Sequence, residues 1–148
     1  MKRKRFLPFL FLLAFPVWAQ HTAIVNTDER LSFVGMTLSE VIERFGAPRT
    51  VFTARGNELW QDDVVFQYPE GDFHFYRDRV WQVRLTSVSG ISNRDRKAAV
   101  LLILGNTAED RGDHVLFSIS GRDWPLMLRV NFNNSGLVSA IYVYRPDF

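Results

Sequence analysis

The first element with a clear hydrophobic pattern begins after residue 37, where apolar residues recur at helical spacing. Its apolar members recur at i, i+3, i+4 and i+7 and are Leu38, Val41, Ile42 and Phe45. This spacing predicts a short amphipathic helix. Thr37 and Glu40 have the spacing of a capping box at its start, and Gly46 followed by Pro48 is typical of a helix end.

Runs rich in valine and aromatic residues follow, separated by Asp, Gly, Pro and Arg-Asp turns. They predict antiparallel strands over Glu58–Gln61, Val64–Tyr68, Asp72–Tyr76 and Val80–Leu85. Residues 47–57 form a less regular stretch. The alternation in the last two of these strands does not give one apolar face. If the turn between them is regular, Val83 and Leu85 lie on the face of Trp81 and not on the face of Phe73. Either a β-bulge shifts the register or both faces of the sheet are covered.

The same order of elements recurs in the second half. A helix over residues 98–104, capped by Ser92 or Asn93 and ended by Gly105, precedes strands over His114–Ser120, Leu126–Phe132 and Leu137–Tyr144. The alternation predicts the core residues Leu126, Leu128, Val130, Phe132, Leu137, Ser139, Ile141 and Val143. The opposite face would carry the alternate side chains, among them Met127, Arg129, Val138, Ala140, Tyr142 and Tyr144.

Aligning Gly46 with Gly105 brings the two helices and the later turns into the same order. This agreement predicts an α+β fold of two tandem helix-plus-antiparallel-sheet repeats, residues 35–88 and 89–148, after an N-terminal extension over 20–34. The alternative is a chance similarity between two short helix-and-hairpin units.

Residues 1–19 have the pattern of a secretory signal peptide. Four basic residues precede the apolar run Phe6–Val17, and Val17 and Ala19 occupy the −3 and −1 positions of a cleavage site. The rival interpretation is a retained membrane anchor, but the apolar run is shorter than the ~20 residues that span a bilayer. We therefore predict a periplasmic or secreted protein that begins at Gln20.

The charge balance changes once this segment is set aside. The chain has 18 Lys and Arg residues against 16 Asp and Glu, and four of the basic residues lie in the leader, so 14 basic residues remain. The mature chain is therefore slightly acidic and gives no indication of nucleic-acid binding. The full sequence of 148 residues includes no cysteine, which excludes disulfides, thiolate catalysis and a cysteine-linked lipid anchor.

The segment Gly35–Pro48 resembles the opening motif of the outer-membrane assembly lipoproteins of the BamE (SmpA/OmlA) family, with Gly-Met-Thr, a short helix and Gly-x-Pro. Leu128–Val138 is similar to the last hairpin of that family, and the tandem layout is similar to that of the β-lactamase inhibitory protein. The chain lacks the lipidated cysteine of the first family and the disulfides of the second. In place of a second Gly-Met-Thr it has Arg94–Arg96. The resemblance implies a non-catalytic surface that binds another protein or a cell-envelope component.

Aromatic, Met and Arg side chains fall on strand faces opposite the predicted core. Such residues are enriched in the centres of protein interfaces, so they are the candidate partner-binding set. The set is His74, Tyr76, Trp81, Met127, Arg129, Tyr142 and Tyr144. Under the alternative interpretation, the irregular segment, the N-terminal tail or contact between the two halves covers them.

Groups with catalytic or metal-binding potential are few. No two of His21, His74 and His114 have the spacing of a metal site, and we expect no metal and no cofactor. Asp113 and His114, with Ser118 or Ser120, are the residue types of a catalytic triad. Their presence alone does not indicate such a site, so we expect no enzymatic activity. The adjacent carboxylates at 62–63 and 109–110 are predicted to be solvated turn charges.

The sequence thus predicts an exported protein-binding module of the bacterial cell envelope that carries no lipid anchor and binds no nucleic acid. Two alternatives stay open. One is a secreted proteinaceous inhibitor of an enzyme, and the other is a carrier of a small apolar ligand or lipid.

Overall fold

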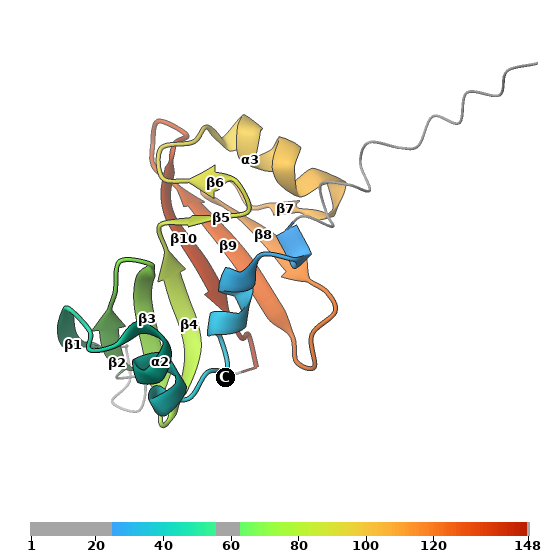
Figure 1. Cartoon of the computed structure of the whole chain (residues 1–148). Coiled ribbons are helices and arrows are strands. Elements are labelled where there is room, and N and C mark those ends of the chain that lie inside the picture. The colour runs from blue at the N-terminus through green and yellow to red at the C-terminus, as the bar shows by residue number, and fades with distance from the viewer. Residues whose placement is uncertain (1–24, 56–62, 148) are drawn as a thin grey trace, which may run out of the picture.

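A single antiparallel sheet of eight strands forms the centre of the computed structural model, which describes residues 25–55 and 63–147 (Figure 1). The strands lie in the order β1-β2-β3-β4-β10-β9-β8-β7. Their bounds are Thr50–Ala54 (β1), Asp63–Gln67 (β2), Gly71–Tyr76 (β3), Arg79–Leu85 (β4), Glu109–Asp110 (β7), His114–Ile119 (β8), Leu126–Phe132 (β9) and Val138–Tyr144 (β10).

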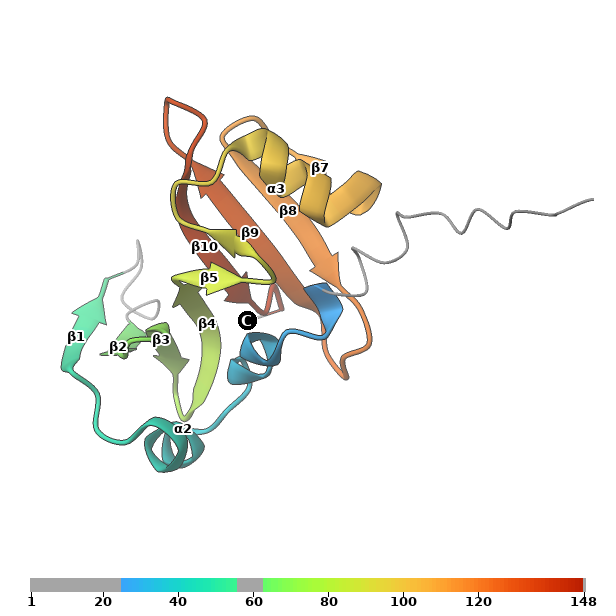
Figure 2. The ribbon, with the colours of Figure 1, turned by 45° about the horizontal axis from the view of Figure 1, so that its top comes forward.

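The helices and a small hairpin cover one face of this sheet (Figures 1 and 2). They are η1 (Glu29–Phe33), α2 (Leu38–Phe45), α3 (Lys97–Leu104), η3 (Gly105–Thr107) and the hairpin of β5 (Ser87–Val88) and β6 (Ile91–Ser92). Within the described residues, neither α-helix has the length and apolar character needed to span a membrane. The predicted signal peptide, its cleavage site and the predicted strand Glu58–Gln61 lie outside the described residues.

The predicted fold class of two tandem helix-plus-sheet repeats is wrong. Strand β4 pairs directly with β10, with Val83 opposite Val143 and Leu85 opposite Ile141, so the strands form one continuous sheet. Pairing removes two open edges whose backbone groups would otherwise need water or another chain. It also places the inward side chains of both strands in one shared core.

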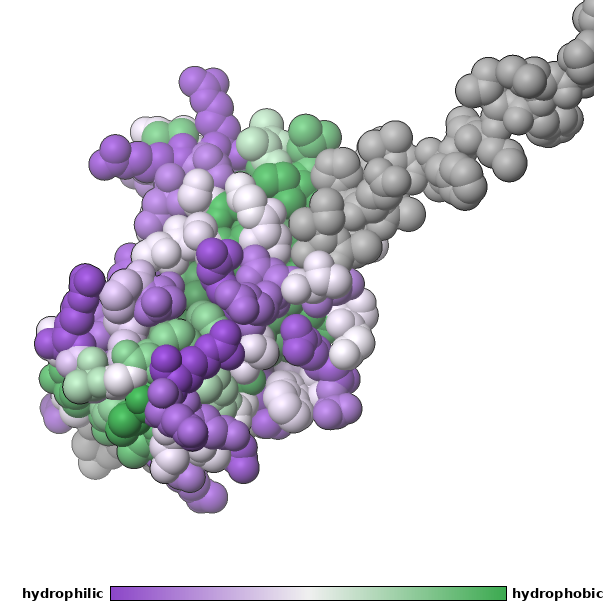
Figure 3. All heavy atoms as spheres, viewed as in Figure 1, coloured by the Kyte–Doolittle hydropathy of each residue, from purple (hydrophilic) through white to green (hydrophobic). Residues whose placement is uncertain are grey.

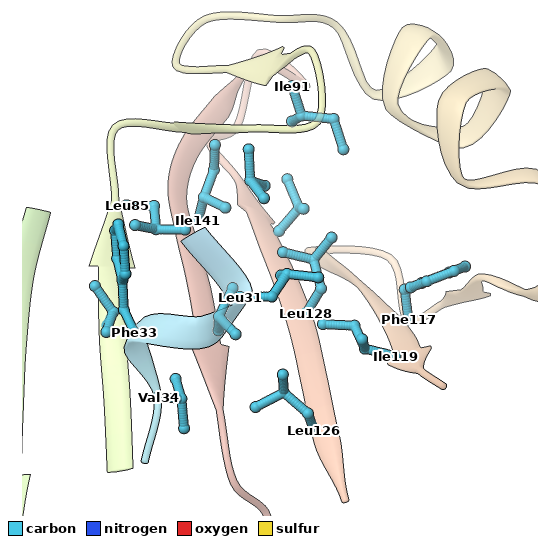
Figure 4. Packing of buried hydrophobic residues seen from close by; sticks show 14 of the residues in the cluster. Leu31, Phe33, Val34, Leu85, Ile91, Phe117, Ile119, Leu126, Leu128 and Ile141 are labelled. Carbon is cyan, nitrogen blue, oxygen red and sulfur yellow. The ribbon is translucent and has the colours of Figure 1, made fainter. Parts of the chain in front are cut away.

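The stretch predicted as an N-terminal extension supplies the middle of that core (Figure 4). Leu31, Phe33 and Val34 are buried, and the Phe33 ring stacks on Phe73 with centroids 5.4 Å apart. Burial of each such side chain is worth about 1.5–3 kcal/mol. Their sequence has no helical or strand periodicity, so the hydrophobic pattern does not predict their burial.

Helix α2 begins as predicted. The Glu40 N–H donates to the Thr37 hydroxyl at 3.2 Å, and the Thr37 N–H donates to the Glu40 carboxylate at 2.7 Å. These hydrogen bonds hold the pKa of Glu40 below its ordinary value. Gly46 ends the helix at a φ of 77°, while Ile42 of the predicted stripe is 44% exposed.

The predicted cap of the second helix is wrong. Arg96 is the N-cap residue of α3 and gives no side-chain cap. Ser92 instead donates its N–H and its hydroxyl to the Asp95 carboxylate, at 2.7 and 3.1 Å. The Ser92–Asp95 contact therefore stabilises the turn before α3 rather than the helix itself.

Two β-bulges settle the register of the central strands. His74 pairs with Gln82 and Phe75 pairs with Val80, which leaves Trp81 as the extra residue and confirms the bulge interpretation of β4. A second bulge at Ser139 reverses part of the prediction for β10. Val138 is buried while Ser139 is exposed.

Candidate functional site

The face of the sheet opposite the helices is here named the open face, because no described helix packs on it. Strand pairing fixes its side chains in two long cross-strand rows. The first row is Glu109, Leu116, Arg129, Tyr142, Arg84, Asp72, Gln67 and Thr50. The second row is Ser118, Met127, Tyr144, Gln82, His74, Val65 and Phe52. Residues far apart in the sequence thus lie side by side on one face of the sheet, where Val65 is fully buried and the other residues of the two rows are exposed or partly buried.

A shallow concavity of about 430 Å³ lies at the centre of the open face, on β4, β9 and β10. Its lining is half aromatic and half polar and consists of Trp81, Gln82, Arg129, Asn131, Tyr142 and Tyr144. All six side chains are partly buried, so their contact surfaces are held in place while one side stays accessible. We call this the sheet concavity.

Trp81 lies in the sheet concavity because of the bulge. With one extra residue in β4, Trp81 and Gln82 both reach this surface, although they are neighbours in the sequence. The indole Nε1 of Trp81 is buried and has no hydrogen-bond partner in the described part of the chain. A buried donor without a partner costs free energy.

Tyr142 lies between two arginines across the strands. Arg129 of β9 and Arg84 of β4 are its register partners on either side. The Arg129 Nε donates to the Asn131 side chain at 2.8 Å, which orients the guanidinium, and Arg84 lies 3.9 Å from the Asp72 carboxylate. Arginine beside a tyrosine ring can pair with carboxylates and stack on other rings, as interface arginines commonly do.

His74 and Asp63 form a partly shielded pair beside the sheet concavity. The His74 Nδ1 lies 3.2 Å from the Asp63 Oδ2, and their side chains are 14% and 11% exposed. The His74 ring also meets Trp81 edge to face, at a centroid distance of 6.4 Å. The prediction that Asp63 is a solvated turn charge is wrong, because β2 starts at this residue and turns it toward His74.

The structure brings together most of the predicted set. Trp81, Arg129, Tyr142 and Tyr144 line the sheet concavity, Met127 is the register partner of Tyr144, and His74 contacts Trp81. Tyr76 lies at the end of β3, where the Arg77 guanidinium is 5.2 Å from its ring centroid. The interpretation that the chain's own segments cover these residues fits only in part, since each is partly exposed.

Two lining residues were missed from the candidate set. Asn131 alternates with Arg129 in the same strand, so periodicity could have found it. Gln82 could not be assigned, because its face depends on the bulge at Trp81.

Asp113 and His114 are in contact, but Ser118 does not lie near them. The Asp113 Oδ1 lies 2.7 Å from the His114 Nδ1, and this hydrogen bond lowers the pKa of Asp113. Ser118 is four residues further along β8, which is about 13 Å at the rise of a strand. No group of three metal-ligating side chains occurs among residues 25–55 and 63–147.

Comparisons with known proteins give one structural likeness. No protein-family model matches the chain, and no curated protein matches it. The 1.5 Å crystal structure of an extracellular protein containing a SCP domain from Bacillus anthracis str. Ames superposes with a TM-score of 0.51 at 11% identity. The match covers 99% of this chain and 50% of that chain, so this chain spans about half the length of that protein. At this identity the likeness concerns the fold alone. This structural neighbour is an SCP-domain protein and belongs to neither of the two families that the sequence resembles.

Proposed function

We propose that this chain is an exported, non-catalytic module that binds another protein of the bacterial cell envelope through its open face. The observation that carries the proposal is the lining of the sheet concavity. It combines one tryptophan, two tyrosines and one arginine, held partly buried by the strands. These residue types are the ones that dominate the binding energy of protein interfaces.

The open face is large enough for the centre of a protein interface. The five strands of six or seven residues, β3, β4, β10, β9 and β8, extend about 19 Å at about 4.8 Å spacing, and six residues along a strand add about 20 Å. The resulting area of about 400 Å² is about half of the roughly 800 Å² that each partner contributes to a standard interface. A shallow, half-polar concavity at its centre resembles the pocket for one anchoring side chain.

Charge favours a partner with an acidic patch. The lining of the sheet concavity contains the cation Arg129 and no carboxylate. Arg84 adds a second positive charge on the other side of Tyr142, partly balanced by Asp72 at 3.9 Å. Complementary charge raises the association rate and disfavours wrong partners.

Export is the second part of the proposal. The signal-peptide pattern of residues 1–19 supports it, and the SCP-domain protein of similar fold is extracellular, which agrees with secretion. The sequence contains no cysteine, so the proposal includes no lipid anchor on a cysteine.

The apolar-ligand alternative fits the site less well. A lipid chain in the sheet concavity would bury the Gln82 amide and the part of the Arg129 guanidinium that its hydrogen bond to Asn131 does not satisfy, which is costly for polar groups. An inhibitor of an enzyme remains a special case of protein binding, in which the partner is the enzyme itself.

Capture from envelope extract tests the proposal. The protein, purified after expression of the full chain, is crosslinked to extract as wild type, Tyr142→Ala and Arg129→Ala. The matched control is Arg122→Ala, since Arg122 is exposed in the loop between β8 and β9. We expect the same partner from wild type and the control, and at least about tenfold less from the two open-face variants. Equal recovery from all four proteins would refute the proposed surface.

A rate assay then separates binding from inhibition. Envelope hydrolases are assayed with and without the purified protein, and a binding module that is not an inhibitor changes no rate. A lowered rate that Tyr142→Ala restores would identify the partner as an inhibited enzyme.

A further inference from the structure

Strand β1 is an open edge of the sheet. It pairs on one side with β2 over all five residues, Thr50 opposite Gln67 through Ala54 opposite Asp63, without a bulge. No described strand pairs with its other side. In an antiparallel edge strand, alternate residues point their N–H and C=O groups outward, so β1 presents backbone donors and acceptors with which no described strand pairs.

The opposite edge of the sheet is protected in the usual way. Strand β7 has only two residues, Glu109 and Asp110, and both are exposed carboxylates. Short edge strands with charged side chains discourage the addition of another strand. β1 has none of these features, because its sequence Thr-Val-Phe-Thr-Ala contains no charge and no proline.

Apolar side chains are exposed on both faces at this edge. Val51 is 53% exposed and Phe52 is 41% exposed, and successive strand residues point to opposite faces. Val64 of the neighbouring strand is 43% exposed. Figure 3 shows apolar surface over β1 and α2 at the lower left of the molecule. A strand added beside β1 would cover part of this surface from both sides.

We propose that β1 binds an extended segment of a partner polypeptide as a ninth, antiparallel strand, with an acidic side chain of that segment beside Arg49. Arg49 lies directly before β1, is exposed, and makes no ion pair within the described residues. A carboxylate at the matching end of the added strand would complement this charge. Backbone pairing gives the affinity in this mode, and side chains at alternate positions give the specificity.

A second copy of the chain is a poorer occupant of the same edge. Two β1 strands paired antiparallel about Phe52 would place Arg49 of each copy opposite Arg55 of the other, since both lie three residues from the centre. Like charges directly opposite each other in a sheet are destabilising. The edge is therefore better matched to an acidic-ended segment than to itself.

Synthetic peptides test the inference on the protein purified after expression of the full chain. The first peptide alternates valine and threonine over five residues between two terminal glutamates. A second carries lysines in place of the glutamates. Two further peptides have the glutamate sequence with N-methyl groups on alternate backbone amides. One peptide carries them on the odd-numbered amides and the other on the even-numbered amides. Binding is followed by titration and by hydrogen exchange of the amides of Thr50–Ala54.

The glutamate peptide is expected to slow exchange of the β1 amides and to bind about fivefold more tightly than the lysine peptide. One of the two N-methylated peptides should bind at least about tenfold more weakly, because it loses the inter-strand hydrogen bonds. Arg49→Glu should reverse the charge preference, and Val51→Lys should weaken binding about tenfold. Tyr142→Ala should bind the peptide like wild type, which keeps this test separate from that of the open face.

Three results would overturn the inference. The first is that the β1 amides exchange at the same rate with and without the glutamate peptide at ~1 mM, a concentration at which even weak binding would be detected. Both N-methylated peptides could bind as tightly as the parent. The protein alone could sediment as a dimer that Val51→Lys dissociates, which would show that a second copy takes the edge. The comparisons between peptides use the wild-type protein, so they do not depend on whether a variant folds.

Discussion

Replacing Ile141 by alanine tests whether the chain forms one cooperative sheet. Ile141 is fully buried in β10, where it lies opposite Leu85 of β4 and Val130 of β9. The change removes three carbons at about 0.8 kcal/mol each and leaves a cavity, so the free energy of unfolding should fall by about 3–4 kcal/mol. With a urea slope of about 2 kcal/mol per molar, the unfolding midpoint should fall by about 1.5–2 M.

Urea unfolding followed by far-UV circular dichroism and by tryptophan fluorescence measures this change. Ser139→Ala is the matched control, because Ser139 lies in the same strand and is exposed, so its free energy should change by less than about 0.5 kcal/mol. Hydrogen exchange adds the decisive readout. In one cooperative sheet, Ile141→Ala speeds exchange equally in β2–β3 and in β8–β9. Loss of protection in β8–β10 alone, or two separate unfolding transitions, would refute the single-sheet account.

Three further changes test local features. Gly71→Ala places a Cβ against the backbone carbonyl of the paired strand and should cost about 2–3 kcal/mol in chemical denaturation. Gly136→Ala meets open space at a φ of 70° and should cost about 1 kcal/mol of strain, so equal losses would contradict the steric argument. Because the folded-state pKa of Glu40 is lowered, its capping contribution is present above its ordinary pKa of 4.5 and is lost as the pH falls through the lowered pKa. The difference in unfolding free energy between wild type and Glu40→Gln should therefore shrink as the pH falls below about 5, and a constant difference would contradict this prediction. Asp63→Ala leaves the shielded His74 without its partner and should lower the thermal midpoint, with a loss of about 1–3 kcal/mol, whereas an unchanged midpoint would show that the pair does not contribute.

Local elements were predictable because local patterns determine them. The capping box and apolar stripe predicted α2, and strict alternation predicted β9 with the bounds Leu126–Phe132 that the structure has. A tight turn also forms at Asn133–Gly136, where the Asn133 side chain accepts from two backbone N–H groups. Strand β1 was missed, because its five residues carry no buried face that would produce an alternating pattern.

Long-range pairing was not predictable from the same patterns. Val83 and Val143 are apolar in either a two-repeat or a one-sheet arrangement, so periodicity could not show that β4 and β10 pair. Leu31 and Phe33 enter the core from a 3-10 helix, which has no amphipathic period to detect. The tandem-repeat prediction failed for this reason: similar orders of elements do not determine whether their edges join.

Predicting the candidate binding set required the register of β4 and, for the other strands, only the alternation of their side chains. Alternation alone placed Arg129 and Tyr142 on the correct face. The face of Gln82 follows from the extra residue in β4, and the sequence offered a bulge only as one of two explanations. Asp63 was misassigned because its burial depends on its contact with His74, which lies on a different strand.

Site-specific photo-crosslinking in living cells tests the central proposal most directly. A photoreactive amino acid replaces Tyr142 on the open face in one variant and Leu102, which is 73% exposed on α3, in the other. The proposal predicts a discrete crosslinked protein from position 142 that is absent from position 102. A partner captured from position 102 and not from 142 would contradict the assignment of the open face as the binding surface.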